Sequence, residues 1–179
     1  MKLKFLFFAF LASACIFTAQ ATPIDDLLDR IGGAGTSARI ITEVIPAFGD
    51  DNFTITSENG KPKISGNSYL SVATGIHRYL KYHAGVMLSW NCLSADLSGV
   101  TFPVPSVAET HSTNLPYRYY LNYCTYSYSM PFWDWERWQQ EIDWMALHGI
   151  NMPLAVVGTD VVWKNVLTKY LGYTPAEAN

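Results

Sequence analysis

Two short stretches of this sequence carry residue types that could contact a ligand. The first holds Asn122, Cys124 and Thr125, within a β-like run of the sequence. The second, Gly-Thr-Asp, ends at Asp160 and follows a nearly all-apolar run. In folds built from βα units, ligands bind at the carboxyl ends of the strands. Their positions therefore make an amide, a thiol, two hydroxyls and a carboxylate candidates for ligand contact.

Each of these candidates also has a purely structural interpretation. Asn122 could be a core amide whose hydrogen bonds are satisfied internally, and Cys124 could be small buried filler. Asp160 could simply begin its helix, where the helix dipole favours a carboxylate. Spacing alone leaves these alternatives open.

No other arrangement in the sequence suggests a reaction centre. The cysteines and histidines are scattered without metal-ligand spacing, and there is no Ser/His/Asp set, P-loop or GxGxxG. Glu136, Glu141 and Asp143 share one predicted helix, where we expect surface charge or helix-to-helix pairing rather than the paired carboxylates of a glycosidase. A net charge of −3 without a basic face argues against nucleic-acid binding. We therefore expect no metal, no cofactor and no nucleic-acid partner.

The first 21 residues have the pattern of an export signal. Two lysines precede an apolar run from Phe5 to about Ala19, and small residues flank Gln20 as a signal peptidase requires. The run is shorter than the roughly 20 residues of a spanning helix. A lipoprotein signal with Cys15 as the lipidated residue is the alternative. We therefore expect a secreted or periplasmic protein, or one anchored through Cys15.

Residues 22–105 are predicted to form a small α/β domain. A helix is expected at 24–31 and a β-rich segment at 38–45. A hairpin follows, with its type I′ turn at Asn59-Gly60. Apolar residues then recur on one face of a predicted helix at 68–85, on which the strands would pack.

A second domain is predicted at 118–179, after a Pro- and Ser/Thr-rich linker at 106–117. The expected elements are a strand, a helix, a strand and a helix, at residues 117–128, 132–149, 150–158 and 159–172. This order is typical of parallel βα units. Two units neither close a barrel nor make a good free-standing sheet, so we expect the N-terminal part of a longer protein.

Tryptophans are dense around the predicted helix at 132–149, which raises the question of packing against ligand stacking. An indole ring packs well on the apolar C–H face of a sugar, and equally well in a core. The helical period favours packing, because it gathers one apolar face. That face is expected to hold Trp135, Trp138, Ile142, Met145 and Ala146.

Two motifs in this region resemble a known family. They are N-x-C-T-x-S-Y-S at 122–129 and W-D-W-x-R-W-x-x-E-I-D-W-M-A-L-x-G-I-N at 133–151. Both resemble the opening of the catalytic domain of the α-N-acetylglucosaminidases, glycoside hydrolase family 89. The stretch at 66–90 resembles that family's N-terminal α/β domain. The resemblance extends from about residue 24 to the end of the chain.

The resemblance implies that residues 118–179 are the first two βα units of a (β/α)8 TIM barrel. The full-length parent would remove terminal α-linked N-acetylglucosamine with retention, using two carboxylates that the family carries beyond the position of Asn179. The fragment itself is therefore expected to be inactive. A non-catalytic glycan-binding surface protein and a related hexosaminidase of other specificity remain the alternatives.

The resemblance also bears on the candidate ligand contacts. Asn122 and Cys124 match an Asn and a Cys that the family's first barrel strand contributes to the pocket for the terminal sugar. Asp160 stands where the family usually has a glutamate, and its side chain is shorter by about 1.5 Å, one C–C bond. Its role therefore stays open, as does the question whether Cys92 and Cys124 are free thiols or form one bridge.

Overall fold

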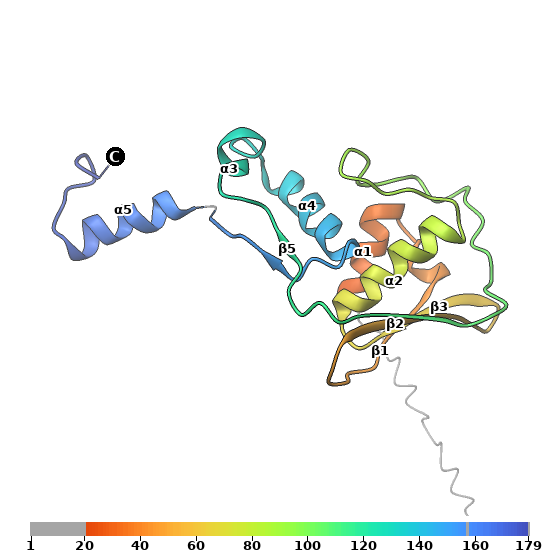
Figure 1. Ribbon diagram of the computed structural model, residues 1–179. Coiled ribbons are helices and arrows are strands. Elements are labelled where there is room, and N and C mark those ends of the chain that lie inside the picture. Colours follow the sequence, from red (N-terminus) through yellow and green to blue (C-terminus); the bar gives the residue numbers. More distant parts are fainter. Residues whose placement is uncertain (1–20, 157, 179) are drawn as a thin grey trace, which may run out of the picture.

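The computed structural model describes residues 21–156 and 158–178, so all but the last residue of the predicted export signal, Cys15 included, lies outside the described residues. Figure 1 shows a four-stranded sheet with helices over one face, and a smaller two-stranded sheet further along the chain. In chain order the elements are α1 (Pro23–Gly32), η1 (Ser37–Arg39), β1 (Ile41–Val44), β2 (Asp51–Glu58), β3 (Lys61–Gly66), α2 (Tyr69–Tyr82), β4 (Glu109–Thr113), β5 (Tyr119–Tyr120), α3 (Thr125–Tyr128), α4 (Trp135–Leu147), β6 (Met152–Pro153) and α5 (Thr159–Tyr170).

The larger sheet has the strand order β1-β3-β2-β4. β1 runs parallel to β3, whereas β2 is antiparallel to both of its neighbours. The predicted hairpin is confirmed as β2 and β3. Its turn residues, Asn59 and Gly60, have φ angles of 51° and 74°, the left-handed values that a type I′ turn requires.

The segment 106–117, expected to be a linker, contributes the edge strand β4 to this sheet. His111 lies opposite Phe53 of β2, and the hydroxyls of Thr54 and Thr110 are 2.9 Å apart. An edge strand exposes much of its surface and can be polar, so its composition does not distinguish it from a linker. β4 therefore belongs to the N-terminal layer, by which we mean the four-stranded sheet with α1 and α2.

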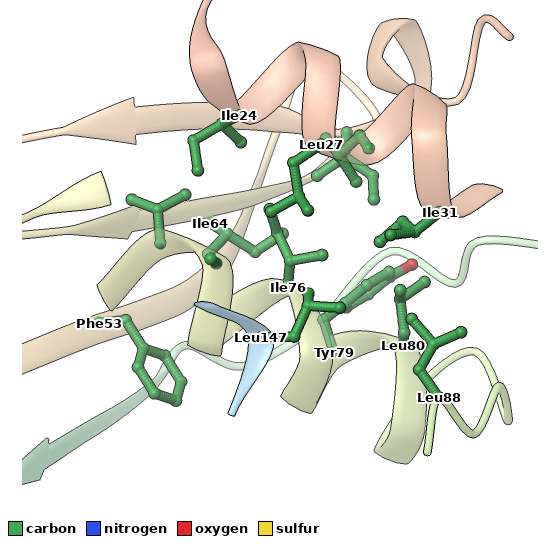
Figure 2. Close-up of a cluster of buried hydrophobic side chains, with 14 of the residues drawn as sticks. Ile24, Leu27, Ile31, Phe53, Ile64, Ile76, Tyr79, Leu80, Leu88 and Leu147 are labelled. Atoms are coloured by element: carbon green, nitrogen blue, oxygen red, sulfur yellow. The ribbon is translucent and has the colours of Figure 1, made fainter. Parts of the chain in front are cut away.

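The core of this layer lies between the sheet and its two helices (Figure 2). α1 begins with a capping box between Thr22 and Asp25, and Ser68 caps the start of α2 by accepting a hydrogen bond from the Ser71 amide. Apolar side chains from both helices and the sheet meet in one cluster. It includes Leu28, Ile31, Ile55, Ile64, Val72, Ile76, Tyr79 and Leu80, all almost fully buried.

The first predicted strand of the second domain is much shorter than expected. Only Tyr119 and Tyr120 form β5, which pairs in parallel with β6. Leu121 then adopts a φ of 73°, which ends the extended run, and α3 follows. The expectation of a strand through residue 128 is therefore wrong, because local turn geometry overrides the β-forming aromatic residues.

The buried face of α4 agrees with the predicted one only in part, because Met145 is buried and Ala146 packs against the core as expected. Trp135 is 63% exposed and Ile142 46%, whereas Glu141 and Asp143 are buried. Burial of the carboxylates is tolerated because each has cationic and hydrogen-bonding partners. Arg30 of α1 donates to Asp143 through two hydrogen bonds of 2.7 Å, which confirms helix-to-helix pairing for this residue.

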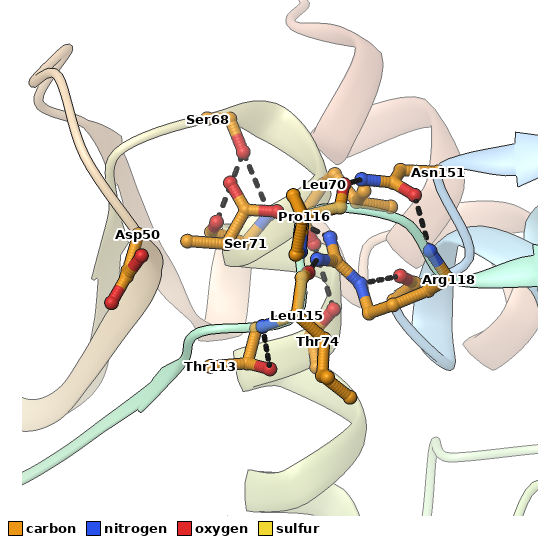
Figure 3. A network of polar contacts seen from close by, with 12 residues as sticks. Asp50, Ser68, Leu70, Ser71, Thr74, Thr113, Leu115, Pro116, Arg118 and Asn151 are labelled. Atoms are coloured by element: carbon orange, nitrogen blue, oxygen red, sulfur yellow. Dashed lines mark hydrogen bonds and ion pairs between the residues drawn. The ribbon is translucent and has the colours of Figure 1, made fainter.

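A polar network around Arg118 connects the N-terminal layer to β5 (Figure 3). The Arg118 guanidinium donates to the carboxylate of Asp51 on β2 and to the Gly149 carbonyl after α4. The Arg118 amide donates to the Asn151 side chain at 2.8 Å, and the Asn151 amide group donates to the Pro116 carbonyl at 2.9 Å. These bonds hold the start of β5 beside the start of β6.

Beyond β6 the chain extends away from the N-terminal layer as α5 (Figure 1). None of the described residues of α5 is buried, and Val161, Val162 and Trp163 are each more than half exposed. In the part of the chain that the structure describes, no helix is long and apolar enough to cross a membrane.

Candidate functional site

Two of the three predicted contact residues directly follow β5, and the third lies further along the chain beyond β6. Asn122 and Cys124 occupy the turn between β5 and α3, and Asp160 lies in the first turn of α5, which follows β6. Parallel strands end at the same edge of a sheet, which brings the two segments to one end of the domain. Contact of these three residues with a ligand stays a prediction.

Asn122 is an exposed residue that supports the turn. Its Oδ1 accepts hydrogen bonds from the backbone amide and from the hydroxyl of Thr125, each at 3.2 Å. The side chain is therefore not a core amide, and its oxygen is occupied by the turn that begins α3. Its Nδ2 group is the part of the amide that a ligand oxygen would meet.

Cys124 is also exposed, at the N-cap of α3. Cys124 and Cys92 are both free thiols. The interpretation of Cys124 as buried filler is thus wrong, since the short α3 turn carries it to the surface. A solvent-accessible thiol at this position is a polarisable group that can approach a ligand.

A hollow of about 710 Å³ lies between α3, the start of α4 and the start of α5. We call it the strand-end hollow. Its wall is aromatic: the rings of Tyr126 and Trp138 stack with centroids 5.9 Å apart, and Trp133 meets Trp138 edge-on at 5.1 Å. Asp160 lines it, whereas Asn122 and Cys124 lie outside its described lining. Tyr123, between those two residues, contributes to the wall.

Tyr126 ties this wall to the second strand. Its hydroxyl donates a hydrogen bond to the backbone carbonyl of Leu154, just after β6, and burial raises the pKa of the phenol. Sequence reasoning singled out the tryptophans near this place but assigned them to packing. Trp133 and Trp138 pack on each other, as expected, and they also line the strand-end hollow.

A buried carboxylate orients β5 from the side of α4. Glu141 has no exposed surface, and it accepts hydrogen bonds from the Tyr120 hydroxyl at 2.8 Å, the Trp90 indole at 3.1 Å and Arg137 Nη2 at 3.0 Å. Burial, and then the hydrogen bond to Glu141, raise the pKa of Tyr120. The expectation of surface charge is therefore wrong for Glu141. Its network fixes the strand from which Asn122 and Cys124 follow.

The chemistry available in the strand-end hollow is that of binding. Its described lining offers aromatic rings, the hydroxyls of Ser127 and Thr159, and a single carboxylate from Asp160. Retaining glycosidases need two carboxyl groups about 5 Å apart. Among the residues that the structure describes, no group of three or more His, Cys, Asp or Glu is placed to hold a metal ion. The arrangement thus suits contact with a polar ring such as a sugar.

Two family models match the chain. The N-terminal domain of α-N-acetylglucosaminidase (NAGLU) matches residues 22–104, and the TIM-barrel domain of α-N-acetylglucosaminidase (NAGLU) matches residues 118–179. Among curated proteins, the chain is 36% identical over 167 residues to the α-N-acetylglucosaminidase of Homo sapiens. That alignment covers 89% of this chain and 22% of the human protein.

Solved structures of a family 89 glycoside hydrolase from Clostridium perfringens have a similar fold. The TM-score is 0.74 at 31% identity, over 87% of this chain and 18% of the bacterial one. One of these structures holds GlcNAc-α-1,4-galactose, described as the substrate of that enzyme, and another holds PUGNAc. The chain thus spans about a fifth of the length of these relatives.

Proposed function

Because the chain belongs to the α-N-acetylglucosaminidase family over residues 22–104 and 118–179, we propose that it forms part of a glycoside hydrolase that removes terminal α-linked N-acetylglucosamine. It supplies the N-terminal layer and the first two βα units of the catalytic TIM barrel. The observation that carries the proposal is the match of both domains, in the family's order, on a chain whose strand ends open onto an aromatic hollow. The substrate of the bacterial relative supports the sugar class.

In this function Asn122, Cys124 and Asp160 contact the terminal sugar. Asn122 and Cys124 are exposed at the end of β5, so a hydroxyl or acetamido group can reach them. The amide donates a hydrogen bond and the thiol offers a small polarisable contact. Asp160, on the wall of the strand-end hollow, accepts hydrogen bonds from sugar hydroxyls.

Hydrolysis with retention would need two further carboxyl groups about 5 Å apart, one as nucleophile and one as general acid and base. We assign these to later strands of a complete barrel, because the strand-end hollow offers only Asp160 among its described residues. Carboxylates perform both steps, so the reaction needs no cofactor. The 179-residue chain is then a sugar-binding part without turnover of its own.

The test compares two purified proteins with an aryl α-N-acetylglucosaminide. The chain of 179 residues should give no aryl release, and a protein that continues it through a complete barrel should hydrolyse the substrate with retention, followed by NMR of the product anomer. In that longer protein Asn122→Ala and Cys124→Ala should raise KM, whereas Tyr170→Ala on the exposed side of α5 should not. Hydrolysis of the substrate by the 179-residue chain would refute the assignment of the catalytic carboxyl groups to later strands.

The other two functions give different results in the same assay. A non-catalytic glycan-binding protein would bind N-acetylglucosamine without hydrolysis even when the barrel is complete. A related hexosaminidase would hydrolyse another sugar or the β-anomer. The reading frame beyond the codon for Asn179 gives an independent check, because later strands should carry the two carboxylates.

We also propose export of the protein, on the pattern of residues 1–21. A cleaved secretory signal gives a mature protein that begins at Thr22 in the medium or periplasm. A lipoprotein signal leaves Cys15 lipidated in the membrane fraction. Mass spectrometry of the N-terminus after cell fractionation distinguishes the two, and a full-length precursor in the cytoplasm would refute both.

A further inference from the structure

A second hollow lies where the N-terminal layer meets the start of α4. It encloses about 390 Å³ and opens to solvent. Such a volume is within the range of roughly 300–1,000 Å³ that is usual for small-molecule sites. The loop after α2 contributes Trp90, Asn91 and Ser94, and the α4 side contributes Trp133, Arg137 and Gln140. We call it the junction hollow.

The indole of Trp90 is fixed by a hydrogen bond and still has a surface exposed to solvent in the junction hollow. Trp90 is 40% exposed, yet its Nε1–H is held by the fully buried Glu141 at 3.1 Å. Trp133 lies with its ring centroid 6.5 Å away at a tilt of 40°. A ring fixed by its polar edge loses little freedom when a ligand packs on its face, which favours binding.

Arg137 lies between the two indoles. Its guanidinium carbon is 3.8 Å from the centroid of Trp133 and 5.5 Å from that of Trp90. Nη2 donates to Glu141, whereas Nη1 is buried without a hydrogen-bond partner among the described residues. The guanidinium is therefore held by Glu141 and by the Trp133 ring, which fixes its place in the wall of the hollow.

The charges of the lining select a neutral ligand. The positive charge of Arg137 is matched by Glu141 at 3.0 Å, so no surplus charge is offered to an anion. The other polar groups are the amides of Asn91 and Gln140 and the hydroxyls of Ser94 and Ser129. Amides and hydroxyls both donate and accept hydrogen bonds, as the hydroxyls of a sugar do.

We propose that the junction hollow is a second carbohydrate site, which takes a neutral hexose or N-acetylhexosamine residue. The sugar stacks on Trp90 and bonds to Asn91 and Gln140. The site shares only Trp133 with the described lining of the strand-end hollow, so each can be occupied and tested separately. The proposal does not depend on hydrolysis by the protein. The lining residues of the junction hollow are proposed to bind a sugar, and the experiment measures only that binding.

The experiment follows the indole Nε1–H signals of the ¹⁵N-labelled 179-residue chain by NMR. Titration with galactose and with N-acetylglucosamine should shift the signals of Trp90 and Trp133 and leave Trp163, on exposed α5, unchanged. The double variant Asn91→Ala/Gln140→Ala removes two exposed side chains and should weaken binding about tenfold, the loss expected for two hydrogen bonds. Its unchanged thermal midpoint would verify the fold.

Matched controls separate this site from its neighbour. Asn165→Ala, an exposed amide on α5, should leave the affinity unchanged. Thr159→Ala alters the lining of the strand-end hollow and should leave the Trp90 response intact. The proposal is overturned if neither sugar shifts Trp90, if the double variant binds as well as the parent chain, or if glucuronate binds and the neutral sugars do not.

Discussion

The Trp90 indole donates a hydrogen bond to the Glu141 carboxylate across 3.1 Å and so joins the N-terminal layer to α4. The same carboxylate accepts from the hydroxyl of Tyr120 on β5 at 2.8 Å. Glu141 is fully buried, so these bonds are shielded from water and each lost bond leaves a polar group without a partner. One side chain thus fixes the first strand of the barrel against the preceding domain.

Replacement of Glu141 by Gln should destabilise the chain by about 3–5 kcal/mol, the usual cost of removing one partner of a buried ion pair. The glutamine keeps the shape but leaves Arg137 with an unmatched charge. The free energy of unfolding in urea measures the effect. Glu136→Gln, on an exposed part of the same helix, should change it by less than about 0.5 kcal/mol. Equal effects of the two substitutions would contradict the role of burial.

The ion pair between Arg30 and Asp143 should contribute about 1 kcal/mol of coupling to stability. Its two hydrogen bonds of 2.7 Å favour a real contribution, while the 36% exposure of the Arg30 side chain limits it. A double-mutant cycle with Arg30→Met and Asp143→Asn measures this coupling. The pair of Lys63 and Glu43, whose carboxylate is more exposed than that of Asp143, is the control and should give a smaller coupling. Equal coupling energies for the two pairs would contradict the idea that the two hydrogen bonds between Arg30 and Asp143 strengthen that pair.

The chain should lose stability as the pH falls from about 6.5 to about 4 because of His77. Burial, and then the nearby His148, lower the pKa of His77 to about 4. The two rings are 4.2 Å apart, at the packing of α2 against α4. The unfolded chain takes up a proton near pH 6.5 and the folded chain does not, so unfolding is favoured as the pH falls. The full stabilisation from neutral His77 is therefore present above about pH 6.5.

We expect this histidine to account for about 1–2 kcal/mol of the loss, less than the full shift implies because the ring is partly exposed. Urea unfolding at intervals between pH 7 and pH 4 measures it. His77→Gln should flatten the slope in that window while the contribution of Glu109 stays in both proteins. The pKa of Glu109 is lowered from 4.5 to about 2 by its hydrogen bonds to His111 and His83, so its stabilisation is lost as the pH falls from about 4.5 to about 2. An unchanged slope in the variant would exclude His77 as the source.

Gly75→Ala should destabilise the chain by about 1–3 kcal/mol, the usual cost of overpacking. Gly75 lies where α2 crosses the sheet, and a Cβ there would be 2.7 Å from Ile64 Cγ2 and 3.0 Å from the ring of Phe53. This clash outweighs the better helix propensity of alanine, which is about 1 kcal/mol. Gly99→Ala is the control, because nothing lies within 4 Å of its Cβ position. A stabilised Gly75 variant would mean that the core repacks freely.

Much of the fold was predictable because its signals are local. The Asn59-Gly60 turn, the N-cap at Ser68 and the apolar face of α2 depend on residues within a few positions of one another. The two motifs after residue 121 likewise placed Asn122 and Cys124 at the end of the first strand. Whether these two contact a sugar stays a prediction, since no ligand contact bears on them.

What escaped prediction depends on distant partners. The polar segment of β4 becomes a strand only because β2 offers it an edge. Glu141 and Asp143 are buried only because Trp90, Tyr120 and Arg30 reach them from elsewhere in the chain. From sequence alone a carboxylate on a helix is expected to face water, since its burial is costly until a partner is known.

The sequence by itself therefore determined the α/β character, because caps, turns and periodicity act over a few residues, and its two motifs indicated the family by resemblance. Only the tertiary structure decided which face of α4 is buried, and that the junction of the two domains encloses a hollow of its own. Both depend on side chains that are distant in the sequence, such as Trp90 and Glu141, which are 51 residues apart. Such pairings are set by packing in three dimensions and leave no local pattern in the chain.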